Sequence, residues 1–566
     1  MDQRNLILAI VLSLAILLTF QFFVVEPQKV TPGDPNGQVA EQMTPSPQAG
    51  TPAAPTPPGA AGIAASGEPG AMSRDEALVT SARVRIETPT LTGSIALTGG
   101  RIDDLILSEY RETIEPDSPN IVLLSPSASE APYFADFGWS SVAPGMVLPN
   151  ADTVWKTNST VLTPDRPVTL SWDNGAGLRF ERTYAIDEHY MFTVSQRVVN
   201  SSDKAVSLAP YGLISRTGTP PILGFYILHE GLIGVFDDVL QEIDYSDLKD
   251  DKRIEQQTTG GWIGITDKYW MVALVPDQDK TVDTRFLYDA ASGVDKYQTD
   301  FLYEAMSVPS GGSAETTSRL FAGAKNVTGL DDYRDRLGIA RFDLSVDFGW
   351  FYWLTKPLFY ALHYIAEKVG NFGVAILILT VGVKLVFFPL ANKSYTSMAK
   401  MRRLQPQMIE LRERYKEDKQ RLNQEMAALY KKEGANPISG CLPIVIQIPV
   451  FFALYKVMFV TIEMRQAPFF GWIQDLSAPD PTSIINVFGL LPFVVPNLGP
   501  LDIINIGVWP LLMGLTMFLQ QQLNPQPPDP IQAKIFLFMP IIFTFLLARF
   551  PAGLVIYWTW NNILSM

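Results

Sequence analysis

Long apolar stretches alternate with polar ones along the chain, and their lengths separate two kinds of structure. Residues 6–25 carry no charge, and an uncharged helix of that length crosses the roughly 30 Å core of a bilayer at 1.5 Å per residue. Further apolar stretches occupy 372–391, 441–462, 503–519, 535–549 and 554–566. The pattern predicts a multi-pass α-helical membrane protein with six spans. The last span appears truncated, because 554–566 extends only about 20 Å as a helix.

The first apolar stretch also has features of a cleaved signal peptide. Its apolar core is longer than such peptides require, and it is followed by Glu26 and Pro27 rather than by small residues. We therefore favour an uncleaved N-terminal anchor at 1–25. Residues 26–80 are rich in Pro, Ala and Gly and cannot bury a core, so they predict an extended linker.

Between residues 81 and 342 the apolar positions recur at every second residue. In "PVTLSWDNGAGLRFERTYAI" (167–186), Val168, Leu170 and Trp172 alternate with polar residues, and Asp-Asn-Gly then marks a turn before the alternation resumes. Similar short stretches follow one another over the whole region. They predict a large all-β sandwich of antiparallel strands.

Two other segments have apolar residues at helical spacing. Residues 347–370 begin with a cluster of aromatics and predict an amphipathic helix lying in the membrane surface, with an ordinary core helix as the alternative. Residues 396–433 predict a helical hairpin whose first arm contains Pro406. Its apolar positions include Met398, Met401, Met408 and Met426. Methionines suit a surface that adapts to varied partners, although a solvated coiled coil has the same pattern.

Composition and charge place these segments relative to a membrane. The chain is 47% hydrophobic with a net charge of -14, which indicates a membrane protein with a soluble part. Residues 26–349 contain 25 Lys and Arg against 45 Asp and Glu, whereas 391–436 contain 11 against 6. Since cytoplasmic loops carry the excess of Lys and Arg, the hairpin and the N-terminus are predicted in the cytoplasm and the β domain in the periplasm. Its acidity also argues against nucleic-acid binding by the β domain.

The sequence offers little for catalysis. One cysteine excludes an intramolecular disulfide, and three scattered histidines make a zinc site improbable. No Gly-rich phosphate loop or nucleophile motif stands out. We expect neither an enzyme nor a bound metal or cofactor.

The charge at Lys384 lies inside an apolar stretch, "LTVGVKLVFFPL" (379–390). A lysine at the centre of a spanning helix costs roughly 3 kcal/mol, so it requires water or a partner. It could snorkel to the cytoplasmic surface. We favour a hydrated cavity, because Thr380, Gln447, Asn561 and Asn562 bring further polar groups into the apolar segments.

Long parts of the second half match a known family. The segments "YTSMAKMRRLQPQMIELRERYKEDKQRLNQEMAALYKKEGANPISGCLPIVIQIPVFFALYKVM" (395–458) and "KIFLFMPIIFTFLLARFPAGLVIYW" (534–558) closely resemble the YidC/Oxa family of membrane protein insertases. The order of segments resembles the Gram-negative form with a large periplasmic domain. The resemblance implies a protein that inserts and helps fold integral proteins of the bacterial inner membrane, alone or with the Sec translocase. It also implies nascent membrane proteins, the ribosome and membrane lipids as partners.

The resemblance implies roles for particular residues. A positive charge matching Lys384 lies in a groove open to the cytoplasm and to lipid, and most members have arginine there. Phe451 and Trp558 map onto a hydrophobic slide for the incoming helix, with Tyr557 and Thr380 nearby. The hairpin corresponds to a mobile cytoplasmic loop.

Two features remain outside that resemblance. The apolar outer stretch 483–500 has no assigned use, and Lys456 is an additional charge for which snorkelling is the favoured interpretation. A polytopic transporter or channel with Lys384 as a substrate or ion site is the alternative function. It predicts internal repeats, and none is visible in the sequence.

Overall fold

A computed structural model describes residues 72–566, except 142–144, 223–227, 292, 435–441, 492–494, 496–503 and 524–529. The predicted anchor 1–25, most of the predicted linker and part of the stretch 483–500 lie outside the described residues.

Two sheets form the β domain. The first, in spatial order, is β14 (Arg253–Thr259), β17 (Thr281–Asp289), β18 (Lys296–Tyr303), β11 (Val206–Thr217), β5 (Tyr133–Ser140), β3 (Ile102–Arg111), β2 (Leu91–Ala96), β1 (Arg83–Glu87) and β7 (Val161–Leu162), with β19 (Met306–Val308) on β11 and β4 (Asn120–Leu124) on β3. The second is β13 (Val239–Asp244), β12 (Gly231–Phe236), β15 (Trp262–Thr266), β16 (Trp270–Val275), β20 (Ser313–Ala324), β10 (Met191–Asn200), β9 (Leu178–Ile186), β8 (Val168–Asp173) and β6 (Lys156–Thr157).

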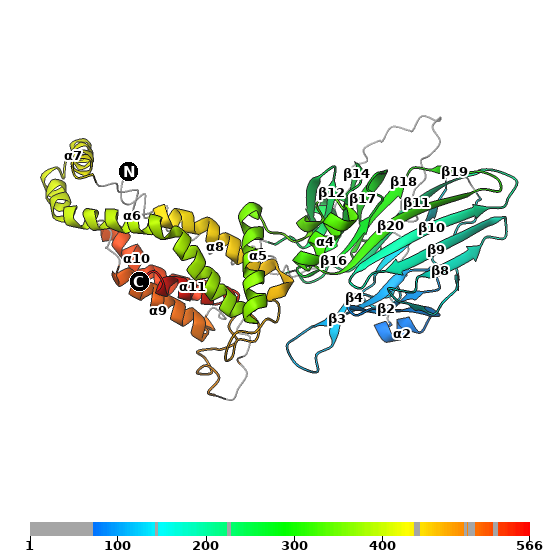
Figure 1. Cartoon of the computed structure of the whole chain (residues 1–566), viewed down its shortest axis with the longest axis horizontal. Coiled ribbons are helices and arrows are strands. Elements are labelled where there is room, and N and C mark those ends of the chain that lie inside the picture. Colours follow the sequence, from blue (N-terminus) through cyan, green and yellow to red (C-terminus); the bar gives the residue numbers. More distant parts are fainter. Residues whose placement is uncertain are drawn as a thin grey trace, which may run out of the picture.

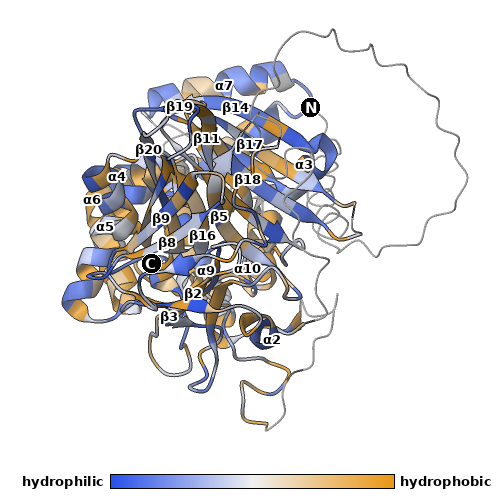
Figure 2. Cartoon of the chain, turned by 90° about the vertical axis from the view of Figure 1, so that its right-hand side faces the viewer, coloured by the Kyte–Doolittle hydropathy of each residue, from blue (hydrophilic) through white to orange (hydrophobic). Residues whose placement is uncertain are grey.

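The pair β8 and β9 shows why the sequence forms a sandwich. Val168, Leu170 and Phe180 are fully buried, while the positions between them are partly or fully exposed. The strands pair antiparallel across a turn at which Gly175 has φ of 70°, a conformation that glycine adopts without strain. In Figure 2 the strands of the domain accordingly mix hydrophobic and hydrophilic colouring. The predicted large β-sandwich is confirmed.

Helices form the remainder of the described chain. Their bounds are α2 (Arg74–Leu78), α3 (Tyr245–Asp251), α4 (Val327–Leu337), η1 (Phe342–Ser345), α5 (Tyr352–Val369), α6 (Phe372–Arg414), α7 (Lys419–Lys432), α8 (Leu442–Val460), η3 (Ile462–Met464), α9 (Val508–Leu523), α10 (Pro530–Leu547) and α11 (Ala552–Ile563). Figure 1 shows the bundle of α6 and α8–α11 on one side, the sandwich on the other, and α5 standing between them.

The helix α6 is longer than the sequence pattern suggested. A span at 372–391 and a separate hairpin at 396–433 were expected, but α6 continues without interruption from Phe372 to Arg414. Residues 392–395 contain neither proline nor glycine, so nothing ends the helix there. The helix is bent in Figure 1, and Pro389 and Pro406 lie within it. Proline removes a backbone hydrogen bond and kinks a helix, which accounts for the bends.

One helix among the described residues, Phe372–Met401, is long and apolar enough to cross a membrane. Two shorter apolar helices occupy Gln447–Val460 and Lys534–Leu547. The helices α9 and α11 lie a few residues from the predicted stretches 503–519 and 554–566.

Most of the buried apolar side chains belong to one continuous cluster that extends across both parts of the molecule. It passes from the sandwich through Phe342, Val346 and Phe348 to Phe359 of α5, and from there into α8. The two parts are therefore joined by packing as well as by the chain.

Candidate functional site

Lys384 lies in the apolar part of α6 and reaches the C-terminal end of α11. Its side chain is half-buried, and Nζ donates a hydrogen bond to Ser565 Oγ at 2.8 Å. Ser565 Oγ in turn donates to Asn561 O at 2.6 Å, and Tyr395 Oη donates to Ser565 O at 3.3 Å. Among the described residues Lys384 makes no ion pair, so its charge is left for water or another molecule.

Asn561, whose backbone carbonyl accepts from Ser565, carries an unsatisfied side-chain atom. Its Oδ1 is buried and has no hydrogen-bond partner in the described part of the chain. Buried polar atoms are nearly always hydrogen-bonded, so a water molecule is the expected partner of this oxygen. The neighbouring Asn562 is satisfied, since its Nδ2 donates to Thr516 Oγ1 of α9 at 3.3 Å.

The other two residues predicted for the groove lie apart from Lys384. Thr380 is 1% exposed, and its hydroxyl donates to Ile376 O of the same helix at 2.6 Å. Gln447 of α8 donates through Nε2 to Tyr557 Oη of α11 at 2.8 Å. Neither is hydrogen-bonded to Lys384 among the described contacts. The polar pair of Gln447 and Tyr557 instead joins α8 to α11.

Aromatic rings next to this pair join three helices. The rings of Phe451 and Trp558 lie 4.6 Å apart between centroids at an interplanar angle of 64°, an edge-to-face arrangement. Phe543 of α10 lies 5.4 Å from Trp558. The two residues predicted to form a hydrophobic slide are therefore neighbours, and both side chains are only partly buried.

The predicted methionine surface is largely used within the chain. Leu404 and Met408 of α6 are buried, and the residues packed around them are Met401 of the same helix and Met426, Leu429 and Tyr430 of α7. Tyr430 Oη donates to Met408 Sδ at 3.8 Å. Met398 lies outside the residues whose side chains are described. The packing leaves Met401 and Met426 partly exposed.

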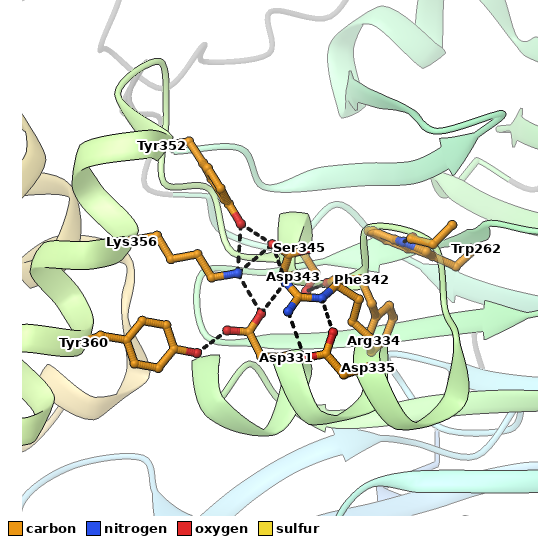
Figure 3. Close-up of polar contacts among 11 residues, drawn as sticks. Trp262, Asp331, Arg334, Asp335, Phe342, Asp343, Ser345, Tyr352, Lys356 and Tyr360 are labelled. Carbon is orange, nitrogen blue, oxygen red and sulfur yellow. Dashed lines mark hydrogen bonds and ion pairs between the residues drawn. The ribbon is translucent and has the colours of Figure 1, made fainter.

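A buried ionic cluster joins the sandwich to α5, and sequence reasoning did not find it (Figure 3). Lys356 Nζ of α5 donates to Asp331 Oδ1 of α4 at 2.6 Å and to Asp343 Oδ2 of η1 at 2.7 Å. Arg334 contacts both carboxylates, and the hydroxyl groups of Tyr352 and Tyr360 each donate to one of them. Burial alone would raise the pKa of Asp343, but the hydrogen bonds and positive charges of this cluster lower it.

A second set of contacts ties the sandwich to the end of α8. Lys456 Nζ donates to Asp347 Oδ2 at 2.7 Å, so this amine is directed toward the segment before α5. Lys268 of the sandwich places its ammonium 3.9 Å from the ring centroid of Phe459, a cation–π contact. Glu463 of η3 accepts a hydrogen bond from Val327 N at 3.0 Å. No local sequence signal indicates these partners, because they lie far apart along the chain.

Glu463 should make this junction sensitive to pH. Burial raises its pKa to about 7, above the roughly 4.3 of an unfolded glutamate. A raised carboxyl pKa contributes stability below the unfolded value, and this contribution is lost as pH rises through the folded value. After correction for intrinsic chemical rates, hydrogen–deuterium exchange at the start of α4 should therefore accelerate by about a hundredfold between pH 5 and pH 8, since about 2 pH units of the interval between the two pKa values lie in this range.

The Glu463→Gln variant is the matched control, since it keeps the acceptor oxygen and removes the titration. Its exchange at α4, corrected for intrinsic chemical rates, should not change over the same range. Equal pH dependence in both proteins would assign the effect to another group.

The fold and these sites define a class of protein: a bundle of apolar helices with a lysine inside one of them, joined to a large β domain. Two family models match, "YidC periplasmic domain" over 83–361 and "60Kd inner membrane protein" over 364–566. The membrane protein insertase YidC of Methylobacterium nodulans is 53% identical over 100% of this chain and 94% of its own length. That of Beijerinckia indica is 52% identical with the same coverage. The chain belongs to the YidC family of membrane protein insertases.

Among solved structures, the active YidC insertase crystal structure with its first transmembrane domain is similar at 17% identity. The match covers 86% of this chain and 92% of that one, with a TM-score of 0.34. Family membership establishes insertase function, and it establishes an inner-membrane protein with a periplasmic domain.

Proposed function

We propose that this chain inserts hydrophobic segments of nascent membrane proteins through a hydrated recess at Lys384. The observation that supports it is an amine in an apolar helix whose one partner among the described residues is the Ser565 hydroxyl. That hydroxyl donates to the backbone of Asn561, whose side-chain oxygen is unsatisfied. Lys384 lies about 18 Å along α6 from Phe372, within bilayer depth. A hydrated recess at that depth shortens the apolar distance that a polar substrate tail must cross.

The proposed insertion is driven by burial of the substrate's own hydrophobic segment. Lys384 attracts acidic groups of the tail, while the hydrophobic segment moves along Phe451 and Trp558 into lipid. Burial of that segment contributes about 25 cal/mol per Å² of apolar surface, so no nucleotide is required. A lysine acts here as a point charge, because it lacks the planar fork of arginine.

The proposed topology has six spans and an N-terminus in the cytoplasm. The anchor 1–25 and the linker 26–80 precede the periplasmic β domain at 81–342, the interfacial helix at 347–370 follows, and the insertase core occupies 371–566 with a cytoplasmic hairpin at 396–433. The charge distribution supports it, since α6 leads directly from an apolar half into the basic segment. The exposed Trp350 and Trp353 at the start of α5 suit a membrane interface.

The basic cytoplasmic segment also supports the proposed partners. Ribosomes expose phosphates, which attract clusters of Lys and Arg. The Sec translocase and membrane lipids are further proposed partners, the lipids through the exposed apolar side chains of α9 and α10.

Site-specific crosslinking tests this function. A photoreactive residue at position 451 or 558 should form an adduct with the hydrophobic segment of a ribosome-bound nascent membrane protein. The same group at Asp203, an exposed residue of the sandwich, is the control and should give none. Absence of adducts at both bundle positions, with a control substrate still inserted, would contradict the proposed path.

A further inference from the structure

The segment between η3 and α9 has an unusually apolar surface. Within residues 465–491, which we call the outer loop, the exposed large side chains are Phe470, Trp472, Ile484, Val487, Leu490 and Leu491. Leu490 is 79% exposed. The sequence carries no charge from 481 to 501. Such a surface is unfavourable in water and indicates a covering apolar medium.

In the tip of the outer loop, residues 484–491, most backbone amide groups are hydrogen-bonded. The amide nitrogens of 487 to 491 donate to carbonyl oxygens at 483, 484, 486 and 487, over 2.6 to 3.2 Å. Asn486, which carries the one polar side chain of the tip, accepts a hydrogen bond from Gly489 N. An irregular segment is unfavourable in lipid when its backbone amide groups are unpaired. In this tip most of the amide groups are paired, so that cost is small.

The tip also has a strained conformation. Val487 and Phe488 have φ of 52° and 58°, a region that is rare for a β-branched residue. Backbone strain of this kind persists where surrounding contacts fix it, and it commonly marks functional segments. The strained turn holds apolar side chains outward instead of folding them onto the bundle.

Asp480 fixes the base of the outer loop against the bundle. Its Oδ1 accepts from Trp472 Nε1 at 3.1 Å and from Thr482 N at 3.0 Å. Its Oδ2 accepts from Trp509 N, in the first turn of α9, at 2.8 Å. The position of the outer loop relative to α9 is therefore set by a network of hydrogen bonds.

The outer loop lies at the level of the bundle. In Figure 1 the trace between α8 and α9 extends beside the bundle, level with α5, and away from the strands. The exposed apolar side chains of α9, among them Leu512, Leu515 and Phe518, continue from it. Trp472 exposes its ring at the base of the loop while its indole nitrogen is bonded, as is common for tryptophan at membrane interfaces.

We propose that the tip of the outer loop inserts into the outer leaflet of the membrane, at the boundary between headgroups and acyl chains. The tip carries no charged side chain, and most of its backbone amides are already hydrogen-bonded. It therefore has few polar groups with which to select a protein partner, whereas a lipid layer requires only apolar surface. The inference rests on the proposed topology, which places this loop on the periplasmic side.

Fluorescence of a single label tests the insertion. Leu490→Cys in a Cys441→Ser background is labelled with an environment-sensitive dye and reconstituted into vesicles containing lipid spin-labelled near the headgroup. Asp203→Cys in the same background is the matched control. The Leu490 label should emit at shorter wavelength and be quenched several-fold more strongly than the control.

Two results would overturn the proposal. One is aqueous emission at position 490 with free access to iodide. The other is short-wavelength emission without quenching by the spin-labelled lipid, which would assign the tip to a protein contact. The topology is tested separately in spheroplasts, where an impermeant thiol reagent should modify Asp203→Cys. Failure of that reaction would contradict the topology rather than the lipid contact.

Discussion

Replacement of Lys384 by methionine should lower insertion of a single-span substrate with a short acidic tail by about tenfold to a hundredfold. Interactions of a charged group with a hydrogen-bonding partner contribute about 1.5–3 kcal/mol, which corresponds to that range. Methionine keeps the length and apolar stem of the side chain. The measurement is the yield of protease-protected substrate in vesicles reconstituted with the purified chain.

Loss of folding should not explain this result. Lys384 makes one hydrogen bond, to Ser565, and no ion pair among the described residues, so removal of its amine leaves no buried carboxylate behind. The unfolding temperature of the variant should stay close to that of the original chain. If the variant unfolds at a lower temperature, the insertion assay should be repeated with protein stabilised by detergent before its yield is interpreted.

Two controls separate charge from geometry. Lys384→Arg should retain most insertion, because the proposed role depends on a positive field and hydration. A substrate whose acidic residues are changed to amides should be less sensitive to Lys384→Met. Equal insertion by the original chain and Lys384→Met, for the acidic and the neutral tail alike, would refute the role of the amine.

Much of the fold follows from local patterns in the sequence. Alternation at 168–172 and 178–182 predicted strands, and β8 and β9 pair there because their buried positions recur at the pleat period of two. The apolar stretches were likewise located by composition. The length of α6 was not predicted correctly. A change from apolar to charged side chains changes the surroundings that suit a helix, but it does not end the helix.

The face of α5 shows a limit of pattern reasoning. The fully buried positions are Thr355, Phe359 and Leu362. Thr355 and Phe359 cannot be recognised as buried from the sequence, because the helix has apolar residues on several sides. Which side is buried depends on the sandwich and α8, which contact α5 from distant parts of the chain.

The resemblance to the insertase family assigned Phe451 and Trp558 to one hydrophobic slide. Their rings are in contact, while the slide itself stays a prediction. Asn561 was named from the sequence as a polar group of the bundle, but nothing indicated Ser565 as the hydrogen-bond partner of Lys384, because the amine could have turned toward several helices. Thr380 is one turn from Lys384, yet its hydroxyl is satisfied within its own helix, as is common for threonine in apolar helices.

The cluster around Lys356 gives the second large prediction. Lys356→Met should destabilise the junction between the sandwich and α5 by about 3 kcal/mol, since removal of one partner from a buried ionic cluster leaves uncompensated charge. Lys356 and Asp343 are both largely buried, and among the described residues only Arg334 remains to neutralise the two carboxylates. Limited proteolysis between η1 and α5 should therefore accelerate by about a hundredfold, together with earlier thermal unfolding.

A compensated variant distinguishes charge from packing. Asp331→Asn combined with Lys356→Met removes the ammonium together with one carboxylate and leaves Arg334 paired with Asp343, so this variant should regain part of the lost stability. Failure to regain any would show that Lys356 acts through the packing of its stem against Tyr352 rather than through its charge.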